Sequence, residues 1–247
     1  VNQIHKSYIQ LKKKNKELKQ VNEFRSNMID TVSHEFRTPL TSILGYTSRL
    51  LRQDIQIDEA TRQKSLKIIK KQSERLRRMI EDLLVIPDIE GARLNVNISN
   101  IPINTVIENS ILLIKNDAHK EIINNLEDCN IEVLADNDRI EQVFVNLIEN
   151  AIKYSTDESP ITLDYEIRNE KLVVSVQNAY EVIPREKLKT LFDKFTRVDD
   201  KTTRTTRGTG LGLFIVKGLV EAMNGEIRLY SNEECGFCVK VFMPIAD

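Results

Sequence analysis

Apolar residues recur at a coiled-coil interval through the first part of the chain. Ile4, Leu11 and Leu18 are seven residues apart, with mostly polar and charged residues between them. A seven-residue apolar repeat is typical of helices that wind around one another. The pattern therefore predicts a signalling helix or coiled coil over residues 1–25, which continues into a longer helix.

The next part of the chain has the pattern of two long amphipathic helices. The first contains Pro39, which removes a backbone hydrogen bond and predicts a kink just past His34. After a polar break, apolar residues follow helical spacing over 58–86, and we expect Pro87 to end this helix. Residues 26–88 should form an antiparallel hairpin. Because a lone hairpin cannot bury both apolar stripes, we expect it to dimerise into a four-helix bundle.

The remainder, residues 89–247, alternates between strand-like and helix-like patterns. This mixture predicts an α+β two-layer sandwich as a second domain. The segment "DNDR" at 136–139 is a good helix start, and "NG" at 224–225 is a good helix end. The expected helices lie near 102–117, 137–154, 184–192 and 211–223, and the expected strands at 94–98, 131–135, 160–167, 171–178, 226–231 and 236–243.

Composition excludes several classes of protein. With 36 basic and 37 acidic residues, the net charge is -1, so no global field favours nucleic acid. The chain has no run of 18 apolar residues that would predict a membrane segment. Three cysteines argue against a disulfide framework, and ordinary strand packing is the favoured interpretation of "CGFC" at 235–238. Because the chain starts without Met inside a helical pattern, we expect it to be part of a longer protein.

Two polar groupings point to a nucleotide. Asn146, Asn150, Lys153 and Tyr154 share one face of a predicted helix, where amide oxygens suit Mg²⁺ and a lysine suits phosphate. Solvated asparagines are the alternative interpretation of that pair. Downstream, a loop enters a helix through a run of glycines, and glycine at a helix start lets phosphates approach the backbone N–H groups. The glycines are Gly208, Gly210 and Gly212, and the basic residues of the loop before them are Lys201, Arg204 and Arg207.

The glycine run is neither of two common nucleotide motifs. Its G-x-G-x-G spacing differs from the Rossmann fingerprint, and no Gly-Lys-Ser/Thr follows as in a P-loop. His34 is equally ambiguous when taken alone. The sequence around it fits a structural histidine whose ring is hydrogen-bonded within the protein, and it also fits a nucleophile. A zinc site is excluded for it, because H-E-x-x-T places no second histidine one turn later.

Four segments, taken in order, resemble the signature motifs of bacterial sensor histidine kinases. They are "SHEFRTPLTSILGY", "NLIENAIKYS", "LFDKFTRVD" and "GTGLGLFIVKGLVEAMNGEI". The resemblance covers nearly the whole chain and implies a dimerisation and histidine-phosphotransfer hairpin followed by a Bergerat-type ATP-binding domain. It also implies a homodimeric two-component kinase that uses ATP and Mg²⁺ and passes a phosphoryl group to the receiver domain of a response regulator.

The resemblance assigns roles to matching residues. His34 would be the phosphoacceptor, and Glu35 would orient or deprotonate its ring. Thr38, roughly 6 Å further along the helix, would position water for a phosphatase reaction. Asn150, with Asn146, would hold Mg²⁺. The remaining nucleotide-binding candidates are Lys153, Tyr154, Asn178, Phe195, Arg204, Arg207, Gly208, Thr209, Gly210, Leu211 and Gly212, with Phe192 as a second lid anchor.

One motif departs from the family pattern. Where the family has Asp-x-Gly-x-Gly, this chain has "NAYEV", with Asn178, Tyr180 and Val182 at the patterned positions. Asn178 can still accept a hydrogen bond from adenine, but its amide adds a donor that must be satisfied. Tyrosine and valine adopt positive φ only at a cost, so we expect the loop to take another path, with Tyr180 as a candidate to fill the adenine slot.

Two other functions stay open at this stage. A degenerate kinase with weakened ATP binding would act as a phosphatase or signalling scaffold through its hairpin. An ATPase of the gyrase or chaperone kind is the third possibility, although those families lack a histidine hairpin upstream. By resemblance, we expect this chain to be a cytoplasmic fragment of a protein that a preceding sensor segment attaches to the membrane.

Overall fold

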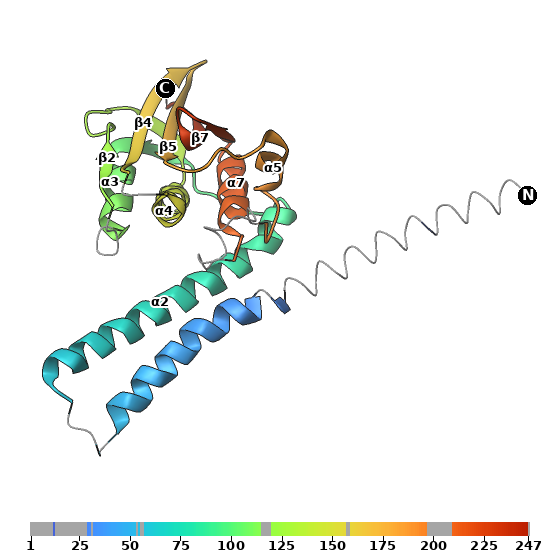
Figure 1. Cartoon of the computed structure of the whole chain (residues 1–247). Coiled ribbons are helices and arrows are strands. Elements are labelled where there is room, and N and C mark those ends of the chain that lie inside the picture. The colour runs from blue at the N-terminus through green and yellow to red at the C-terminus, as the bar shows by residue number, and fades with distance from the viewer. Residues whose placement is uncertain are drawn as a thin grey trace, which may run out of the picture. The chain divides into compact units, whose positions relative to one another are not determined.

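The structure, a computed structural model, divides the chain into two compact units, Val1–Met79 and Ile80–Asp247 (Figure 1). The predicted coiled coil over 1–25 lies outside the described residues, apart from the helical Lys12. In the part of the chain that is described, no helix combines the length and apolar character needed to cross a membrane. The described residues are 12, 29–30, 32–52, 54, 57–114, 120–156, 159–196 and 209–246.

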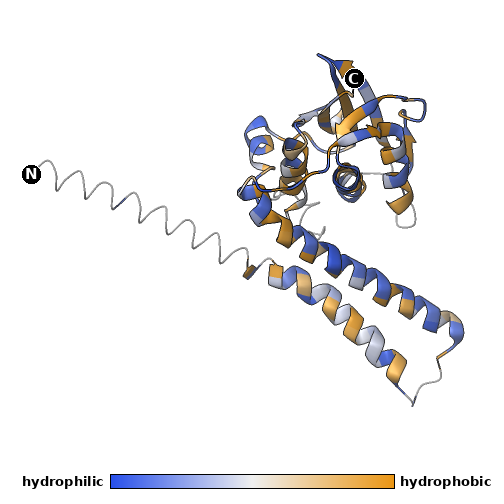
Figure 2. Cartoon of the chain, turned by 180° about the vertical axis from the view of Figure 1, so that it is seen from behind, coloured by the Kyte–Doolittle hydropathy of each residue, from blue (hydrophilic) through white to orange (hydrophobic). Residues whose placement is uncertain are grey.

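The first unit contains the predicted helical hairpin except for the last turns of its second helix, which belong to the second unit. Residues 32–51 are helical, and the second helix, α2, spans Glu59–Glu90. Asp58 caps α2, because its carboxylate accepts hydrogen bonds from the Thr61 backbone N–H at 2.8 Å and from the Thr61 hydroxyl at 2.6 Å. Hydrophobic residues recur along both helices (Figure 2), as the amphipathic pattern predicts.

The prediction that Pro87 ends the second helix is wrong. Helix α2 continues through Pro87 to Glu90, and the chain leaves it only at Gly91, whose N–H bonds to the Pro87 carbonyl at 3.0 Å. The helix tolerates the proline because its last turns are anchored by packing. Val85 and Ile86 are buried in the core of the second unit, and such burial outweighs one missing hydrogen bond.

The second unit is the predicted two-layer sandwich. Its five-stranded sheet has the order β2-β4-β5-β7-β6 and is mixed, because β2 runs parallel to β4 whereas the other pairs are antiparallel. Helices α3, α4 and α7 form the layer on one face of this sheet (Figure 1). The bounds are α3 Ile103–Ile114, α4 Asn137–Tyr154, α5 Arg185–Thr190, α7 Gly212–Ala222, β2 Ile122–Asn124, β4 Ile161–Arg168, β5 Lys171–Asn178, β6 Glu226–Asn232 and β7 Gly236–Pro244.

One strand prediction is wrong, and one strand was not predicted. No strand forms over 94–98, because the Asn97 backbone N–H bonds to the Asp136 side chain at 2.8 Å instead of a neighbouring strand. The first strand, β1, is Ser99–Pro102, which pairs with β3, Glu132–Ala135. The three-residue β2 was not predicted, since so short a segment carries no clear alternation.

Helix α4 begins and packs as its sequence predicts. Asp136 is its N-cap, and its side chain accepts from the backbone N–H groups of Asp138 and Arg139, both at 3.1 Å. The apolar stripe of the helix, which includes Phe144, is buried against the sheet. This burial fixes the direction of the polar face that carries the asparagines.

The "CGFC" segment is packed as ordinary sheet structure. Cys238 lies in β7, where burial raises the pKa of its thiol to about 11. A thiol with so high a pKa stays protonated at neutral pH and is a poor metal ligand or nucleophile. Within the described ranges, no group of three or more His, Cys, Asp or Glu side chains is placed to hold a metal ion.

Candidate functional site

The candidate phosphoacceptor, His34, lies on the surface of the hairpin. It is exposed on the 32–51 helix. An exposed imidazole is open to a reactant that approaches from outside the hairpin. The position therefore suits a group that reacts rather than one that packs in a core.

Glu35, the next residue, is buried. It is 5% exposed, and its carboxylate pairs with the guanidinium of Arg75 on α2 at 3.1 Å. Consecutive helical residues point in directions about 100° apart, which explains why one side chain is exposed and its neighbour buried. Arg75 was missed by sequence reasoning, because nothing distinguishes it from the other basic residues of α2.

Thr38 lies one turn beyond His34, as predicted. Its hydroxyl donates to the His34 backbone carbonyl at 3.4 Å. Such a bond to the carbonyl four residues earlier holds the threonine side chain against the helix backbone. It also leaves the threonine oxygen on the helix surface near the histidine.

The second unit contains an open cavity. Its lining is largely apolar with a few convergent polar groups, as in ligand sites generally. Helix α4, the sheet and the turn before α7 supply most of the wall. The lining residues are Asp82, Asn146, Leu147, Asn150, Ala151, Lys153, Tyr154, Val176, Asn178, Tyr180, Ile183, Leu191, Thr196, Thr209, Gly210, Gly212, Leu213, Phe237 and Val239.

One end of the cavity, here called the phosphate end, is formed by the asparagine pair and the start of α7. A Cβ added to Gly212 would lie 3.9 Å from Asn146 Oδ1, 4.0 Å from Asn150 Oδ1 and 3.3 Å from Asn150 Nδ2. The amide nitrogen of Asn146 donates to the Gln142 carbonyl at 3.0 Å, which directs its oxygen away from that bond. Two amide oxygens therefore converge near one point beside the N-terminus of α7.

This arrangement fits a hydrated Mg²⁺ bound to phosphates. Magnesium prefers oxygen ligands and keeps several waters, so two protein amides with phosphate oxygens make a suitable donor set. The absence of a side chain at Gly212 leaves room for phosphate oxygens at the backbone N–H groups of the helix start. The sequence predicted only that the two asparagines share one helix face. In the fold, their amide oxygens also lie close to the same point beside Gly212.

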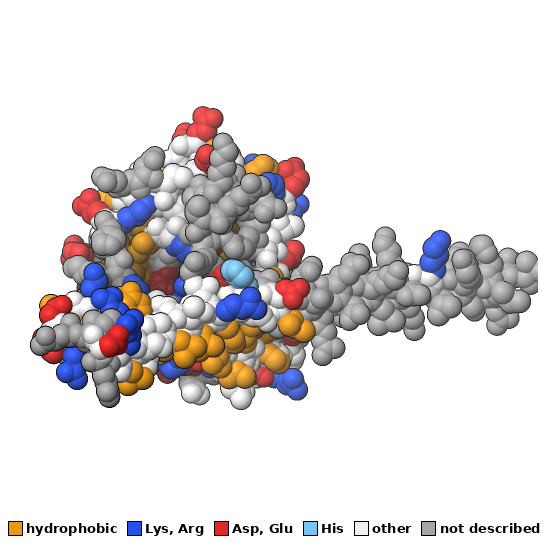
Figure 3. Space-filling view, turned by 60° about the horizontal axis from the view of Figure 1, so that its bottom comes forward, with side chains coloured by type: hydrophobic (Ala, Val, Ile, Leu, Met, Phe, Trp, Pro, Cys, Tyr) orange, Lys and Arg blue, Asp and Glu red, His pale blue; other side chains and the backbone are white. Residues whose placement is uncertain are grey.

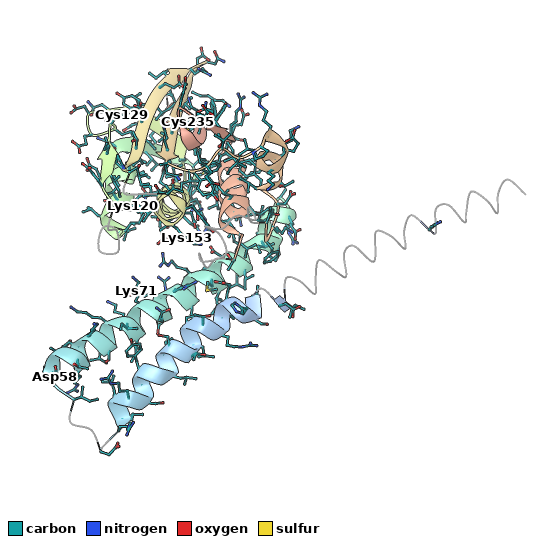
Figure 4. The ribbon with its side chains drawn as sticks, viewed as in Figure 1. Asp58, Lys71, Lys120, Cys129, Lys153 and Cys235 are labelled. Carbon is teal, nitrogen blue, oxygen red and sulfur yellow. The ribbon has the colours of Figure 1, made fainter. Side chains whose placement is uncertain are left out.

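The basic group of the wall comes from α4. Lys153, labelled in Figure 4, donates from its ammonium group to the Tyr154 hydroxyl at 3.0 Å and lies 4.6 Å from the centroid of the same ring. Both contacts hold the ammonium group at the cavity wall. Lys153 therefore supplies a positive charge next to the two amides.

The glycine turn is built around Gly210. Its φ is +70°, and a Cβ there would lie 2.8 Å from the Phe195 carbonyl carbon. The Phe195 N–H bonds to the Gly210 carbonyl at 2.9 Å, so the predicted lid anchor contacts the turn through its backbone. Thr209 lines the cavity, whereas the side chain of Leu211 is fully buried in the core and does not line it.

The other end of the cavity, here called the base end, has one buried amide in an apolar lining. Asn178 is 4% exposed, and its Nδ2 donates to the Ala179 carbonyl at 3.1 Å. That carbonyl also accepts from the Thr156 N–H at 2.8 Å. The extra donor of asparagine is therefore satisfied locally, and the amide oxygen remains as an acceptor at the cavity wall.

The loop after Asn178 takes the alternative path that the sequence predicts. Neither Tyr180 nor Val182 has a positive φ. The close approach is made from the opposite strand, where Gly236 has φ +62° and a Cβ would lie 2.6 Å from the Asn178 carbonyl oxygen. Tyr180 lies on the cavity wall, and the cavity stays open beside it.

Four of the predicted residues, Lys201, Arg204, Arg207 and Gly208, lie outside the described residues.

Sequence reasoning missed several residues that line the cavity. The apolar side chains of the base end come from short, separate segments that carry no local motif. Asp82 comes from α2, where nothing in the sequence separates it from the other acids. The missed apolar residues include Val176, Ile183, Leu191, Phe237 and Val239.

Two family models match successive parts of the chain. Residues 24–92 match the His Kinase A (phospho-acceptor) domain. Residues 135–247 match the histidine kinase-, DNA gyrase B-, and HSP90-like ATPase. The first of these models excludes a stand-alone gyrase or chaperone ATPase, because it assigns a phospho-acceptor domain to the hairpin.

Individual relatives agree with both models. The chain is 32% identical to the sensor histidine kinase WalK of Bacillus subtilis over 236 residues, covering 94% of this chain and 38% of the relative. It is 31% identical to the sensor protein VanSC of Enterococcus gallinarum over 226 residues, covering 87% of this chain and 60% of the relative. The chain thus spans less than two thirds of these relatives.

A solved structure supports the fold. The Acinetobacter baumannii histidine kinase AdeS superposes with a TM-score of 0.60 at 24% identity, over 87% of this chain and 98% of that one. Nothing in these comparisons favours a degenerate kinase. The chain belongs to the bacterial sensor histidine kinases, of which it carries the phospho-acceptor and ATPase domains.

Proposed function

We propose that this chain is the catalytic region of a two-component kinase that phosphorylates His34 with ATP and transfers the phosphoryl group to an aspartate of a response regulator. The observation that carries the proposal is the pairing, in one chain, of an exposed histidine on a hairpin with a cavity whose amides converge on a helix start. Neither the exposed histidine nor the cavity would by itself indicate a kinase. Together they supply an acceptor and a nucleotide site.

In the proposed reaction, a ring nitrogen of His34 attacks the γ-phosphorus of ATP. A nitrogen–phosphorus bond forms, the bond from phosphorus to the bridging oxygen breaks, and ADP leaves with that electron pair. The ring gives up its proton, for which Glu35 is the proposed acceptor. Arg75, paired with Glu35 at 3.1 Å, would hold that carboxylate in place between the two hairpin helices.

The phosphate end would hold the triphosphate. Asn146 and Asn150 would bind Mg²⁺, which neutralises phosphate charge when bound, and Lys153 would contact a phosphate oxygen. The N-terminus of α7 would donate backbone N–H groups to the same oxygens. Catalysis of this kind consists mostly of positioning and charge neutralisation.

The base end would bind adenine. Because Asn178 Nδ2 is bound to the Ala179 carbonyl, its oxygen is the group available to accept from an exocyclic amino group. The apolar lining would exclude water from this bond and so strengthen it. Phe195 and, beyond the described residues, Arg204, Arg207 and Gly208 would close over the nucleotide.

The hairpin would also form the dimer and receive the response regulator. Its helices leave Leu40, Leu44, Leu51 and Leu66 between 44% and 75% exposed, and Figure 3 shows hydrophobic side chains gathered along this surface. A second copy of the hairpin would bury them in a four-helix bundle. Thr38, one turn from His34, would position the water that hydrolyses a phosphorylated regulator.

The direct test is phosphorylation with labelled ATP and Mg²⁺. The protein should become labelled through a bond that acid breaks and base does not, and His34→Gln should abolish the label. Thr38→Ala is the matched control on the same helix, since it should retain the label while losing phosphatase activity toward a phosphorylated regulator. An unlabelled wild-type protein, or label that survives His34→Gln, would contradict the proposal.

A further inference from the structure

The last turn of α2 packs against α7 within the second unit (Figure 1). Ile89 lies where Gly218 of α7 has no side chain, since a Cβ added to Gly218 would meet Ile89 side-chain carbons at 2.5 and 2.8 Å. Glycine inside a helix is less favourable than alanine, so its presence needs a packing reason. Gly218 has one, because it leaves a space on α7, here called the Gly218 notch, that Ile89 fills.

Glu90, the last residue of α2, extends this contact to the segment after α5. Its carboxylate forms an ion pair with Lys194, whose ammonium group also lies 5.1 Å from the centroid of the Phe214 ring on α7. In the other direction, the ammonium group of Lys217 on α7 lies 5.3 Å from the centroid of the Phe192 ring. Two reciprocal cation–π contacts therefore hold this segment on α7, and Glu90 reinforces one of them.

The same segment supports the glycine turn of the phosphate end. Phe195, next to Lys194, has φ +60°, a left-handed conformation that is unfavourable for a bulky residue. Its N–H donates to the Gly210 carbonyl at 2.9 Å, and a Cβ on Gly210 would meet the Phe195 backbone at 2.8 Å. A strained backbone persists only where surrounding contacts fix it. The contacts of Lys194 thus help to fix the backbone against which Gly210 packs.

We propose that the docked end of α2, formed by Ile89 and Glu90, preorganises the Gly210 turn, so that docking of α2 and binding of the nucleotide favour each other. Ile89 and Glu90 are then positioning residues, and Glu90 acts through Lys194. The proposal rests on the nucleotide function proposed above and deepens it by naming how the site is regulated. Because α2 is also the second helix of the hairpin, a change in the hairpin that released this end would lower the affinity for nucleotide.

A pair of substitutions at the Gly218 notch tests the proposal in the full chain, by calorimetric titration with ADP and Mg²⁺. Gly218→Ala should displace Ile89 and weaken ADP binding about fivefold, through loss of preorganisation. The variant should still fold, since alanine favours the helix itself. Adding Ile89→Ala removes the colliding carbons, so the double variant should bind ADP within about twofold of the unaltered protein. A purely structural role of Gly218 in α7 would give no such rescue.

The ion pair is tested by Glu90→Gln, which should weaken ADP binding about threefold because Lys194 loses one of the contacts that fix it. Asp88→Asn is the matched control, since it removes one negative charge from an exposed residue of the same helical turn and should leave the affinity unchanged. Equal weakening by Asp88→Asn and Glu90→Gln would overturn the role of the ion pair.

Hydrogen exchange measures the docked end itself. The backbone N–H groups of Gly91, Ala92 and Arg93 bond to carbonyls of the last turn of α2, so their exchange reports on its opening. Linkage is reciprocal, and ADP should therefore slow this exchange in the unaltered protein but not in Gly218→Ala. Exchange that ADP leaves unchanged in the unaltered protein would overturn the coupling.

The affinities separate the remaining outcomes. Equal ADP affinity in the unaltered protein, Gly218→Ala and Glu90→Gln would overturn the coupling while leaving the nucleotide function intact. Tighter binding in either variant would overturn it as well, because the docked end of α2 would then oppose the nucleotide. Absence of ADP binding in the unaltered protein would contradict the proposed function itself, together with this inference.

Discussion

The two ends of the cavity use their glycines differently. At the phosphate end, Gly210 and Gly212 lie in the motif where the family pattern places them, and both line the cavity. At the base end, the patterned glycines are replaced by Tyr180 and Val182, and the close approach is made by Gly236 on the neighbouring strand, which meets the Asn178 and Tyr180 backbone. Glycine at the base end therefore serves the packing of two protein segments, whereas at the phosphate end it lies in the cavity wall.

The difference shows which part of the site requires a local sequence motif and which part several separate segments of the fold can build. The phosphate end depends on backbone N–H groups at a helix start, and nothing elsewhere in the fold can replace them. The base end depends on one acceptor and an apolar slot, which several segments can build. We therefore expect the phosphate end to tolerate substitution poorly and the base end to tolerate it better.

The largest effect should follow from Gly210→Ala. Alanine at φ +70° is strained, and its Cβ would meet the Phe195 backbone at 2.8 Å, so the substitution should cost about 1–3 kcal/mol. We expect the turn to shift and ADP affinity to fall by roughly 30-fold, measured by calorimetry. Gly45→Ala is the control, because a Cβ there meets nothing within 4 Å. Equal affinities for the two variants would remove the argument for a rigid phosphate end.

A smaller effect is expected from Asn178→Leu at the base end. The variant loses the acceptor for the adenine amino group, at a cost of about 1–2 kcal/mol, and ADP affinity should fall about tenfold. Gln177→Leu is the control, since neighbouring strand residues point to opposite faces of the sheet. If Gln177→Leu weakened ADP binding as much as Asn178→Leu, the assignment of the acceptor would be wrong.

The smallest effect concerns the outer face of the sheet, away from the cavity. The hydrogen bond from Lys240, at 2.8 Å, lowers the pKa of Glu166 below its ordinary value. Because the folded pKa is the lower one, the pair stabilises the fold above the unfolded pKa, and that stability is lost as pH falls through the folded pKa. Both side chains are partly exposed, so Glu166→Gln should reduce the unfolding free energy at neutral pH by less than about 1 kcal/mol.

Urea unfolding at neutral pH and at a pH below the ordinary glutamate pKa measures this effect. The difference between wild type and Glu166→Gln should shrink in acid, while ADP affinity stays unchanged. Glu234→Gln, an exposed residue in the turn after β6, serves as the control. A change in ADP affinity with Glu166→Gln would mean that the outer face is coupled to the cavity.

The sequence predicted the elements whose patterns are long and local. Helix α4 was placed correctly, because its apolar stripe and its Asp136 cap are both readable within one segment. The path after Asn178 was also anticipated, since tyrosine and valine disfavour positive φ. The pairing of Asn178 with the Ala179 carbonyl follows the same logic, because a buried donor needs a partner.

What the sequence did not predict depends on contacts between distant segments. The continuation of α2 past Pro87 reflects burial of Val85 and Ile86 by the second unit, which outweighs a local rule about proline. The partner of Glu35, Arg75, is 40 residues away. Asp82 is another residue that only the packing of α2 brings to the cavity. Such pairings have no local period or spacing to reveal them.

The central claim is that the base end still binds the adenine of ATP, although Asn178, Tyr180 and Val182 replace the family's Asp-x-Gly-x-Gly pattern. Calorimetry of the unaltered chain with ADP and Mg²⁺, repeated with GDP, tests it most directly. The account predicts binding of ADP at micromolar concentration and at least about tenfold weaker binding of GDP, because Asn178 presents an acceptor where guanine also presents one. Absence of ADP binding, or equal affinity for the two nucleotides, would contradict it.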